Sequence, residues 1–259
     1  MTLEAVIFDV DGTLAETEEL HRAAFNDAFA RHGRDWRWDA ASYHELLAVE
    51  GGLARLRAFV ERVAPRELAN LEHAGELEAI HATKSDLYLS LVEEGAPLRP
   101  GVARLLHDVR SAGLKLAACT TSSRANFEAL ILNALGFEAL EWFGAVVTRE
   151  DVEAVKPDAA PYRATLARLG VAADRAIVIE DSARGVAAAR GAGIDVIAAP
   201  GLYTRGEDLS GALMALSDLG EPAAPFEVLA GDPGPFRHVS TDALAFWHAR
   251  AREGADAAA

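Results

Sequence analysis

The stretch VIFDVDGTL, residues 6–14, places two carboxylates one residue apart directly after an apolar run. Side chains alternate between the two faces of a strand, so Asp9 and Asp11 share one face while Val10 points to the other. Two like charges this close need a positive charge beside them. The stretch therefore predicts a buried strand whose end carries an acidic, cation-binding site.

Short apolar runs alternate with longer amphipathic patterns along most of the chain. The expected strands are residues 5–8, 115–119, 145–147, 176–179 and 195–198. The expected helices between them are residues 101–113, 125–136, 160–170 and 183–193, and each pattern ends at a glycine. This alternation predicts the α/β class, with a doubly wound parallel sheet, helices on both faces and right-handed crossovers.

One connection, directly after the acidic strand, is far longer than the others. It is rich in helical patterns, of which residues 18–33 and 51–64 are the clearest, and we expect it to form a lid. The predicted domains are an α/β core of residues 1–16 and 93–220, an inserted all-helical cap of residues 17–92, and a C-terminal extension of residues 221–259. In the extension we expect Thr241 to cap a short helix that contains Phe246 and Trp247 and packs on the core.

Composition narrows the class of protein. The 259-residue chain has 51% hydrophobic residues, enough for a sizeable core, and its formal net charge of -15 leaves no basic face for nucleic acid or an anionic membrane. Its one cysteine, Cys119, excludes an intramolecular disulfide and is expected to be buried and inert. No run approaches the ~18 apolar residues of a membrane span, and the N-terminus lacks a secretory signal. We expect a cytoplasmic protein with no nucleic-acid, membrane or obligate protein partner.

Polar residues follow the expected strands at the point where each strand ends. Because the carboxyl ends of parallel strands meet at one edge, these side chains are expected to lie together. They suit Mg²⁺, which prefers hard oxygen ligands. The predicted metal ligands are Asp9, Asp11, Glu180 and Asp181.

The same residues predict phosphoryl-transfer chemistry. Asp9 is expected to attack phosphorus and form an aspartyl-phosphate, while the metal and Lys156 screen the repulsion between the carboxylate and the phosphate. Asp11 is expected to protonate the leaving oxygen and later to activate water. Thr120 is expected to donate a hydrogen bond to the transferring phosphoryl group.

These motifs resemble those of the haloacid dehalogenase superfamily. Its first motif is matched by residues 9–13, its second by Thr120, its third by residues 156–157 and its fourth by residues 180–182, in the family's order. The resemblance implies a Rossmann-like core with a helical cap after the first strand. In the dehalogenases that name the superfamily the second aspartate is absent, so Asp11 favours phosphate chemistry.

Within the capped subgroup the chain resembles the CbbY-type sugar-phosphate phosphatases, through DVDGTLAETEELHRAAFN, WRWDAASYHELL, VEGGLARL, TTSSRANFEAL and GLYTRGEDLSGALMALSDLGEP. Members of that family associated with carbon fixation remove phosphate from xylulose-1,5-bisphosphate, an inhibitor of Rubisco, and the resemblance implies this activity. The expected substrate-binding residues are Glu18, His21, Tyr43, Gly51, Gly52, Thr121, Arg124 and Asn126. The family's glycine pair is commonly followed by lysine, whereas this chain has Leu53, and Arg55 or Arg124 is the hypothetical substitute.

Two other functions remain open from the sequence. A receiver-type phosphoacceptor module also clusters aspartates, a threonine and a lysine on a doubly wound sheet, although the cap and the late Glu180–Asp181 pair speak against it. A mutase that isomerises hexose phosphates through a bisphosphate would share the fold and the motifs. Among the cap residues, His21 has an alternative interpretation as a packed histidine, since it precedes Phe25 and Phe29 on one amphipathic helix.

Overall fold

The computed structural model describes residues 2–49 and 51–256. Residues 1, 50 and 257–259, which fall within the predicted core, cap and C-terminal extension, lie outside the described residues. The chain divides into two compact units, Met1–Glu16 with Pro97–Ala259, and Thr17–Ala96. We call them the sheet unit and the helical unit, and each is described by itself.

The sheet unit contains one sheet of seven strands in the order β3-β2-β1-β4-β5-β6-β7. The strands are β1 (Ala5–Phe8), β2 (Lys115–Cys119), β3 (Phe143–Val147), β4 (Ala176–Glu180), β5 (Asp195–Ala198), β6 (Met214–Leu216) and β7 (Val228–Ala230). All neighbouring pairs are parallel except β6 and β7. Because β1 lies between β2 and β4, its end is flanked by the ends of these two strands. The predicted doubly wound α/β fold is confirmed.

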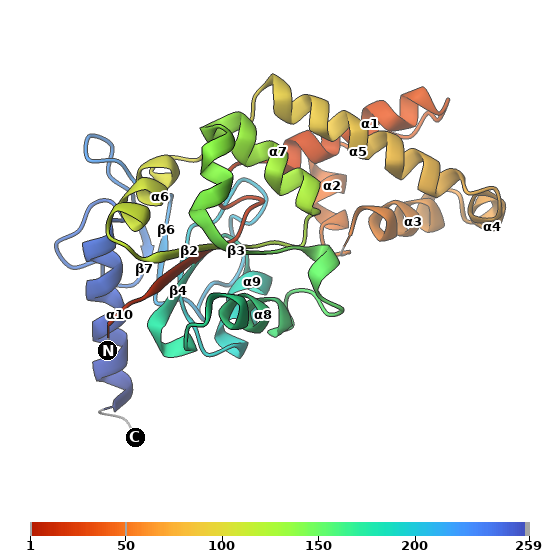
Figure 1. The fold of residues 1–259 in the computed structure, drawn as a ribbon. Coiled ribbons are helices and arrows are strands. Elements are labelled where there is room, and N and C mark those ends of the chain that lie inside the picture. Colours follow the sequence, from red (N-terminus) through yellow and green to blue (C-terminus); the bar gives the residue numbers. More distant parts are fainter. Residues whose placement is uncertain (1, 50, 257–259) are drawn as a thin grey trace. The chain divides into compact units, whose positions relative to one another are not determined.

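Helices cover both faces of this sheet, with α6 and α7 on one side and α8 and α9 on the other (Figure 1). Their bounds are α6 (Val102–Ser111), α7 (Arg124–Leu135), α8 (Ala160–Leu169) and α9 (Ala183–Gly191). Alternate strand residues such as Ile7 and Val178 pack with Tyr162 and Val186 from α8 and α9, and all are buried. Strands buried on both faces read as continuous apolar runs, which is why the sequence located them.

The C-terminal part of the sheet unit differs from the prediction. Strands β6 and β7 were not expected, because three-residue strands carry too short an alternation to recognise. Helix α10 (Thr241–Asp256) is longer than predicted, and Thr241 was wrongly expected to cap it. Ser240 does so, since its Oγ accepts from the N–H of Ala243 at 3.2 Å. Trp247 is buried, as expected of a helix packed on the sheet unit.

The helical unit contains α1 (Glu18–Arg31), α2 (Ala40–Leu46), α3 (Gly52–Val63), α4 (Pro65–His73) and α5 (Glu76–Glu94). An aromatic cluster forms its core. Trp38 is fully buried and lies with its ring centre 4.4 Å from that of Phe25, 5.2 Å from that of Phe29 and 5.4 Å from that of Phe59. Large rings supply much apolar area for few residues, so a unit of this size can hold its own core.

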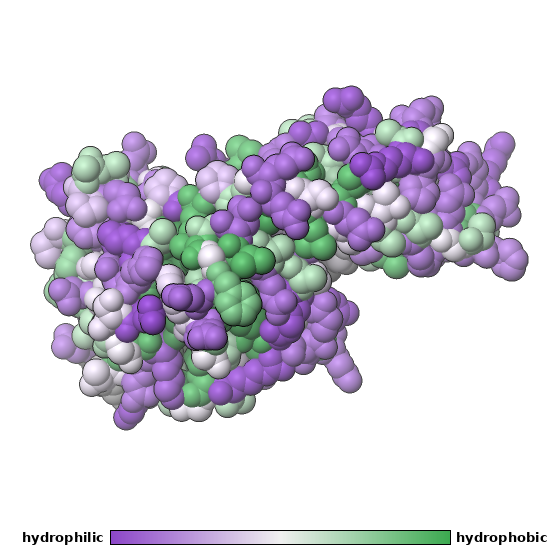
Figure 2. Space-filling view, turned by 45° about the horizontal axis from the view of Figure 1, so that its top comes forward, coloured by the Kyte–Doolittle hydropathy of each residue, from purple (hydrophilic) through white to green (hydrophobic). Residues whose placement is uncertain are grey.

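The visible surface is mainly hydrophilic. Hydrophilic side chains cover most of the face seen in Figure 2, and apolar side chains gather in smaller areas. Among the described residues, none of the helices combines the length and the apolar character that crossing a bilayer requires.

Candidate active site

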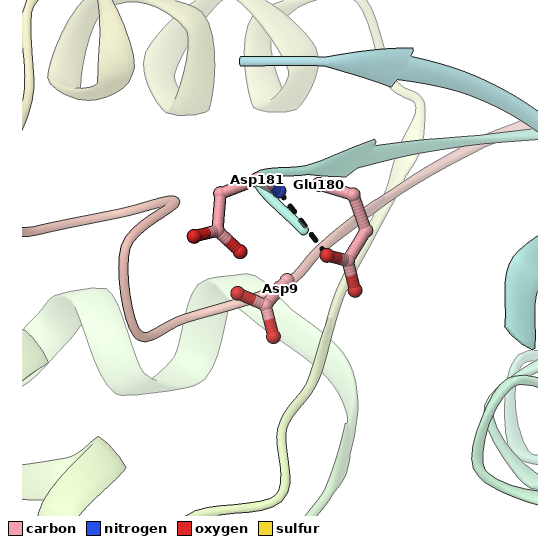
Figure 3. Close-up of side chains that lie close together, drawn as sticks. All are labelled: Asp9, Glu180 and Asp181. Atoms are coloured by element: carbon pink, nitrogen blue, oxygen red, sulfur yellow. Dashed lines mark hydrogen bonds between the residues drawn. The ribbon is translucent and has the colours of Figure 1, made fainter. Parts of the chain in front are cut away.

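Three acidic side chains meet where β1 and β4 end. Asp9 follows β1, Glu180 is the last residue of β4, and Asp181 follows it (Figure 3). The pairing of Phe8 with Ile179 sets these ends at the same level, and the N–H of Asp9 donates to the carbonyl of Ile179 at 3.0 Å. Each side chain offers one oxygen within 4.8 Å of the others, and all three are buried. The sequence placed these carboxylates at one edge, and the parallel register brings them together.

Lys156 is the cation that neutralises part of this charge. Its Nζ lies 2.7 Å from Asp9 Oδ1 and 2.6 Å from Glu180 Oε1, and it also donates to the carbonyl of Cys119 at 2.8 Å. These three contacts use all three N–H groups of the ammonium. Burial by itself would lower the pKa of Lys156, but Asp9 and Glu180 raise it well above its ordinary value. Lys156 therefore stays protonated and fixes the relative positions of the two carboxylates.

Glu180 is fully buried and bonded on both oxygens. Oε1 accepts from Lys156 and from the hydroxyl of Tyr162 at 2.7 Å, while Oε2 accepts from the N–H of Asp181 at 3.1 Å and the hydroxyl of Ser182 at 3.2 Å. Gly185 of α9 packs against it so closely that a Cβ there would lie 1.9 Å from the carboxyl group. Glu180 is thus held rigidly, and it holds Lys156 in turn.

The sequence did not single out Tyr162. It lies on the apolar face of α8, where an aromatic residue reads as ordinary core. Its hydroxyl has a carboxylate partner that only the folded chain supplies, and burial raises the pKa of Tyr162 well above its ordinary value.

Asp9 has one oxygen left over. Oδ1 accepts from Lys156, but Oδ2 is buried and has no hydrogen-bond partner among the described residues. Burial raises the pKa of Asp9 from 3.8 to about 7, against the opposing effect of Lys156, and Glu180 raises it further. Burial, followed by Asp9 and Glu180, also raises the pKa of Asp181.

The residues fit a divalent cation. With all three carboxylates ionised, the group holds three negative charges and the single positive charge of Lys156, and it leaves one buried oxygen of Asp9 without a partner. A divalent cation would neutralise the excess and use that oxygen. Carboxylate oxygens are the donors that hard divalent ions prefer.

Asp11 lies apart from this group. Its carboxylate is not one of the three that gather, and its Oδ2 accepts from the hydroxyl of Thr120 at 3.3 Å. Thr120 is oriented by Ser122, whose N–H donates to Thr120 Oγ1 at 2.9 Å. Gly12 begins the turn that follows Asp11. Its φ is +84°, and a Cβ there would lie 2.3 Å from Asp181 Oδ2. The turn therefore requires glycine for both its conformation and its closeness to Asp181.

The predicted substrate-binding residues of the sheet unit lie at the start of α7. Thr121 is partly buried in the turn before this helix. Asn126 donates to Ser122 Oγ at 3.2 Å. Arg124 donates to Asp151 Oδ2 and to the carbonyl of Val146, both at 3.1 Å. The charge of Arg124 is therefore already paired with a carboxylate.

In the helical unit, three residues form a hydrogen-bonded chain. The hydroxyl of Tyr43 donates to Glu18 Oε2 at 2.6 Å, and Arg55 Nη1 donates to the hydroxyl oxygen of Tyr43 at 3.0 Å. Arg55 also donates to the carbonyl of Leu46 at 3.2 Å. Glu18 and Tyr43 were predicted together, and the fold joins them directly.

His21 contacts Lys84, a residue for which the sequence pattern predicted no role. Its ring stacks on Tyr88 with centroids 3.9 Å apart, and its Nδ1 lies 2.7 Å from Nζ of Lys84. His21 is buried, as the packed interpretation expects. Gly51 is the N-cap residue of α3, and a Cβ on Gly52 would lie 2.5 Å from His81 Nε2.

Comparison with known proteins places the chain among hydrolases. A family model described as haloacid dehalogenase-like hydrolase matches residues 3–193. Protein CbbY (plasmid) of Cupriavidus necator is 42% identical over 248 residues, covering 95% of this chain and 97% of that protein. A crystal structure of a CbbY mutant from Rhodobacter sphaeroides in complex with xylulose-(1,5)bisphosphate is 42% identical, with a TM-score of 0.75 over 86% of this chain and 98% of that chain. A phosphorylated carbohydrates phosphatase of Thermotoga maritima is 33% identical over 198 residues, 75% of this chain and 84% of that protein.

Proposed function

The chain belongs to the haloacid dehalogenase-like hydrolases, and we propose that it is a Mg²⁺-dependent phosphatase of small sugar phosphates whose substrate is xylulose-1,5-bisphosphate. One observation carries the chemistry. Asp9 stands in a buried group of three carboxylates, is bonded to Lys156 on one oxygen and has the other oxygen without a partner. The substrate is proposed from the similarity to the CbbY structure that holds this compound.

In the proposed reaction Asp9 is the nucleophile. A carboxylate oxygen of Asp9 forms a bond to phosphorus while the bond from phosphorus to the sugar oxygen breaks, which leaves an aspartyl-phosphate and the sugar alcohol. Lys156 stays cationic and reduces the repulsion between Asp9 and the phosphate. A divalent cation held by Asp9, Glu180 and Asp181 would add positive charge against the phosphoryl oxygens.

Asp11 is proposed to move the proton. It gives a proton to the departing sugar oxygen, then takes one from the water that attacks phosphorus and releases phosphate and free Asp9. The hydroxyl of Thr120 lies 3.3 Å from Asp11 Oδ2. Because Thr120 is expected to bond to the phosphoryl group, this contact supports the proposal that Asp11 lies beside that group. The alternative role of Asp11 as a metal ligand stays a prediction.

The substrate contacts in both units also stay predictions, and the contacts of Arg55 and Arg124 distinguish these two arginines. Arg124 is paired with the carboxylate of Asp151, whereas Arg55 contacts the hydroxyl and ring of Tyr43 and a backbone carbonyl, all of them neutral. We therefore favour Arg55 as the residue that replaces the lysine absent at Leu53. Arg55→Gln is expected to raise KM for the bisphosphate more than Arg124→Gln does.

The test is release of inorganic phosphate from a panel of substrates, with Mg²⁺ and with EDTA. The panel contains xylulose-1,5-bisphosphate, ribulose-1,5-bisphosphate, fructose-1,6-bisphosphate, phosphoglycolate and β-glucose-1-phosphate. We expect metal-dependent release that favours the xylulose compound, and no release by Asp9→Asn. Conversion of β-glucose-1-phosphate to its isomer without phosphate release would instead establish a mutase, and release by Asp9→Asn would refute the covalent mechanism.

A further inference from the structure

Arg99 is buried near the sheet edge that carries the acidic group, and the mechanism does not use it. Only 7% of its side chain is exposed. Its four terminal N–H groups all donate to backbone carbonyls. Nη1 donates to the carbonyl of Ala199 at 2.6 Å and also to that of Gly12. Nη2 donates to the carbonyl of Pro200 at 2.9 Å and to that of Ser217 at 3.1 Å. A rigid fork of donors can satisfy several acceptors at fixed positions, which the flexible ammonium of lysine cannot.

These carbonyls come from three separate loops. Gly12 belongs to the loop after β1, Ala199 and Pro200 to the loop after β5, and Ser217 follows β6. The first two loops touch closely, because a Cβ on Gly201 would lie 3.1 Å from the carbonyl oxygen of Gly12. Arg99 therefore binds the loop after Asp11 to the loop after β5.

The carboxylate of Glu16 connects the same two loops. Glu16 lies 3.4 Å from Nε of Arg99, and its carboxylate accepts from the N–H of Leu202 at 3.1 Å. Arg99 also donates its own backbone N–H to the carbonyl of Leu14 at 2.8 Å. Removal of the guanidinium would take the donor away from the carbonyls of Gly12, Ala199, Pro200 and Ser217.

The loop after β5 reaches the acidic group through Thr204. The N–H of Gly201 donates to Thr204 Oγ1 at 2.8 Å, so the hydroxyl proton is free to be donated elsewhere. Its partner is Asp181 Oδ2 at 2.9 Å. Gly12, on the other loop that Arg99 holds, packs against the same oxygen of Asp181. Both loops that Arg99 joins thus fix the orientation of one carboxylate.

We propose that Arg99 and Thr204 are positioning residues that set the Asp181 carboxylate for binding a divalent cation. This inference rests on the proposed function, because it assumes that the acidic group holds the cation. Groups that bond to a metal ligand orient it, and their loss typically lowers metal affinity about 10- to 100-fold.

The experiment measures Mn²⁺ binding to the full chain by electron paramagnetic resonance, in which the signal of free Mn²⁺ falls on binding. Thr204→Val removes the hydroxyl at nearly constant shape, and Thr204→Ser keeps it. Arg99→Lys keeps the charge and removes the fork. Arg104→Lys is the matched control, since Arg104 likewise donates to backbone carbonyls, those of Gly220 and Val239, in another part of the sheet unit.

We expect Thr204→Val and Arg99→Lys to bind Mn²⁺ about 10- to 100-fold more weakly, and Thr204→Ser and Arg104→Lys to stay within about threefold of the parent protein. Saturating Mn²⁺ should restore phosphate release by Thr204→Val, because the hydroxyl orients a ligand and takes no part in the reaction. If Arg99→Lys does not fold, the Mn²⁺ affinity of Thr204→Val decides whether the inference holds, because Thr204 bonds directly to Asp181.

Mn²⁺ affinity of Thr204→Val within threefold of the parent would overturn the inference and leave the proposed function intact. Absence of Mn²⁺ binding by the parent protein would instead refute the metal-dependent function, and the inference with it.

Discussion

Protons and the divalent cation should compete for Asp9. Burial raises the pKa of this carboxyl to about 7, so a large fraction of it carries a proton at neutral pH in the metal-free protein. A metal ligand must be deprotonated, and binding therefore has to displace that proton. The apparent metal affinity is expected to rise with pH between about 6 and 8, a range in which an ordinary aspartate is fully ionised.

The size of the effect follows from the pKa. A single group with a pKa of about 7 is about 90% protonated at pH 6 and about 10% protonated at pH 8, so the affinity for Mg²⁺ should rise about tenfold over this range. Asp181, whose pKa is also raised, would add to this rise. At pH 7 binding should release about half a proton from Asp9 alone.

Isothermal titration calorimetry with Mg²⁺ at pH 6, 7 and 8 measures both quantities. Titrations in two buffers with different ionisation enthalpies give the number of protons released. Asp9→Asn is the control, because its amide does not titrate, and its affinity should depend less on pH. A parent protein whose Mg²⁺ affinity is constant from pH 6 to 8, with no proton release, would refute the reasoning.

The same pKa fixes the sign of a stability effect in EDTA. Between about pH 4 and pH 7 the folded protein keeps the Asp9 proton that the unfolded chain has lost, so its free energy of unfolding falls as pH rises. Over the full range this loss is on the order of 4 kcal/mol from this group. Asp9→Asn lacks it, so the stability of the variant relative to the parent should increase with pH; a constant difference in urea titrations would contradict the raised pKa.

Three further substitutions test the site. Asp11→Asn should slow hydrolysis of sugar phosphates far more than that of an aryl phosphate with a good leaving group, and equal losses in kcat would contradict the acid role. Tyr162→Phe should lower the free energy of unfolding by about 1.5–3 kcal/mol, because it removes a buried hydrogen bond to Glu180. An unchanged urea midpoint would show that this bond contributes nothing to stability. Gly185→Ala should destabilise by about 3 kcal/mol, whereas Gly191→Ala in the same helix, whose Cβ would meet nothing closer than 3.3 Å, should change stability by less than about 1 kcal/mol; similar effects of the two would refute the close packing against Glu180.

The sequence by itself determined the α/β class and five of the strands, because each strand buried on both faces is a continuous apolar run bounded by polar residues. It also placed Asp9, Lys156 and Asp181 at one edge, since the carboxyl ends of parallel strands must meet there. These inferences depend on local patterns and on one topological rule. They required no knowledge of which side chains touch.

Only the tertiary structure decided the partners. Tyr162 bonds to Glu180, Arg99 bonds to carbonyls about a hundred residues away, and Thr204 bonds to Asp181. No local sequence pattern predicts any of these pairs. The same holds for the two short strands β6 and β7. The physical reason is that a buried donor binds whichever acceptor the packed chain brings within reach, and that choice belongs to the whole fold.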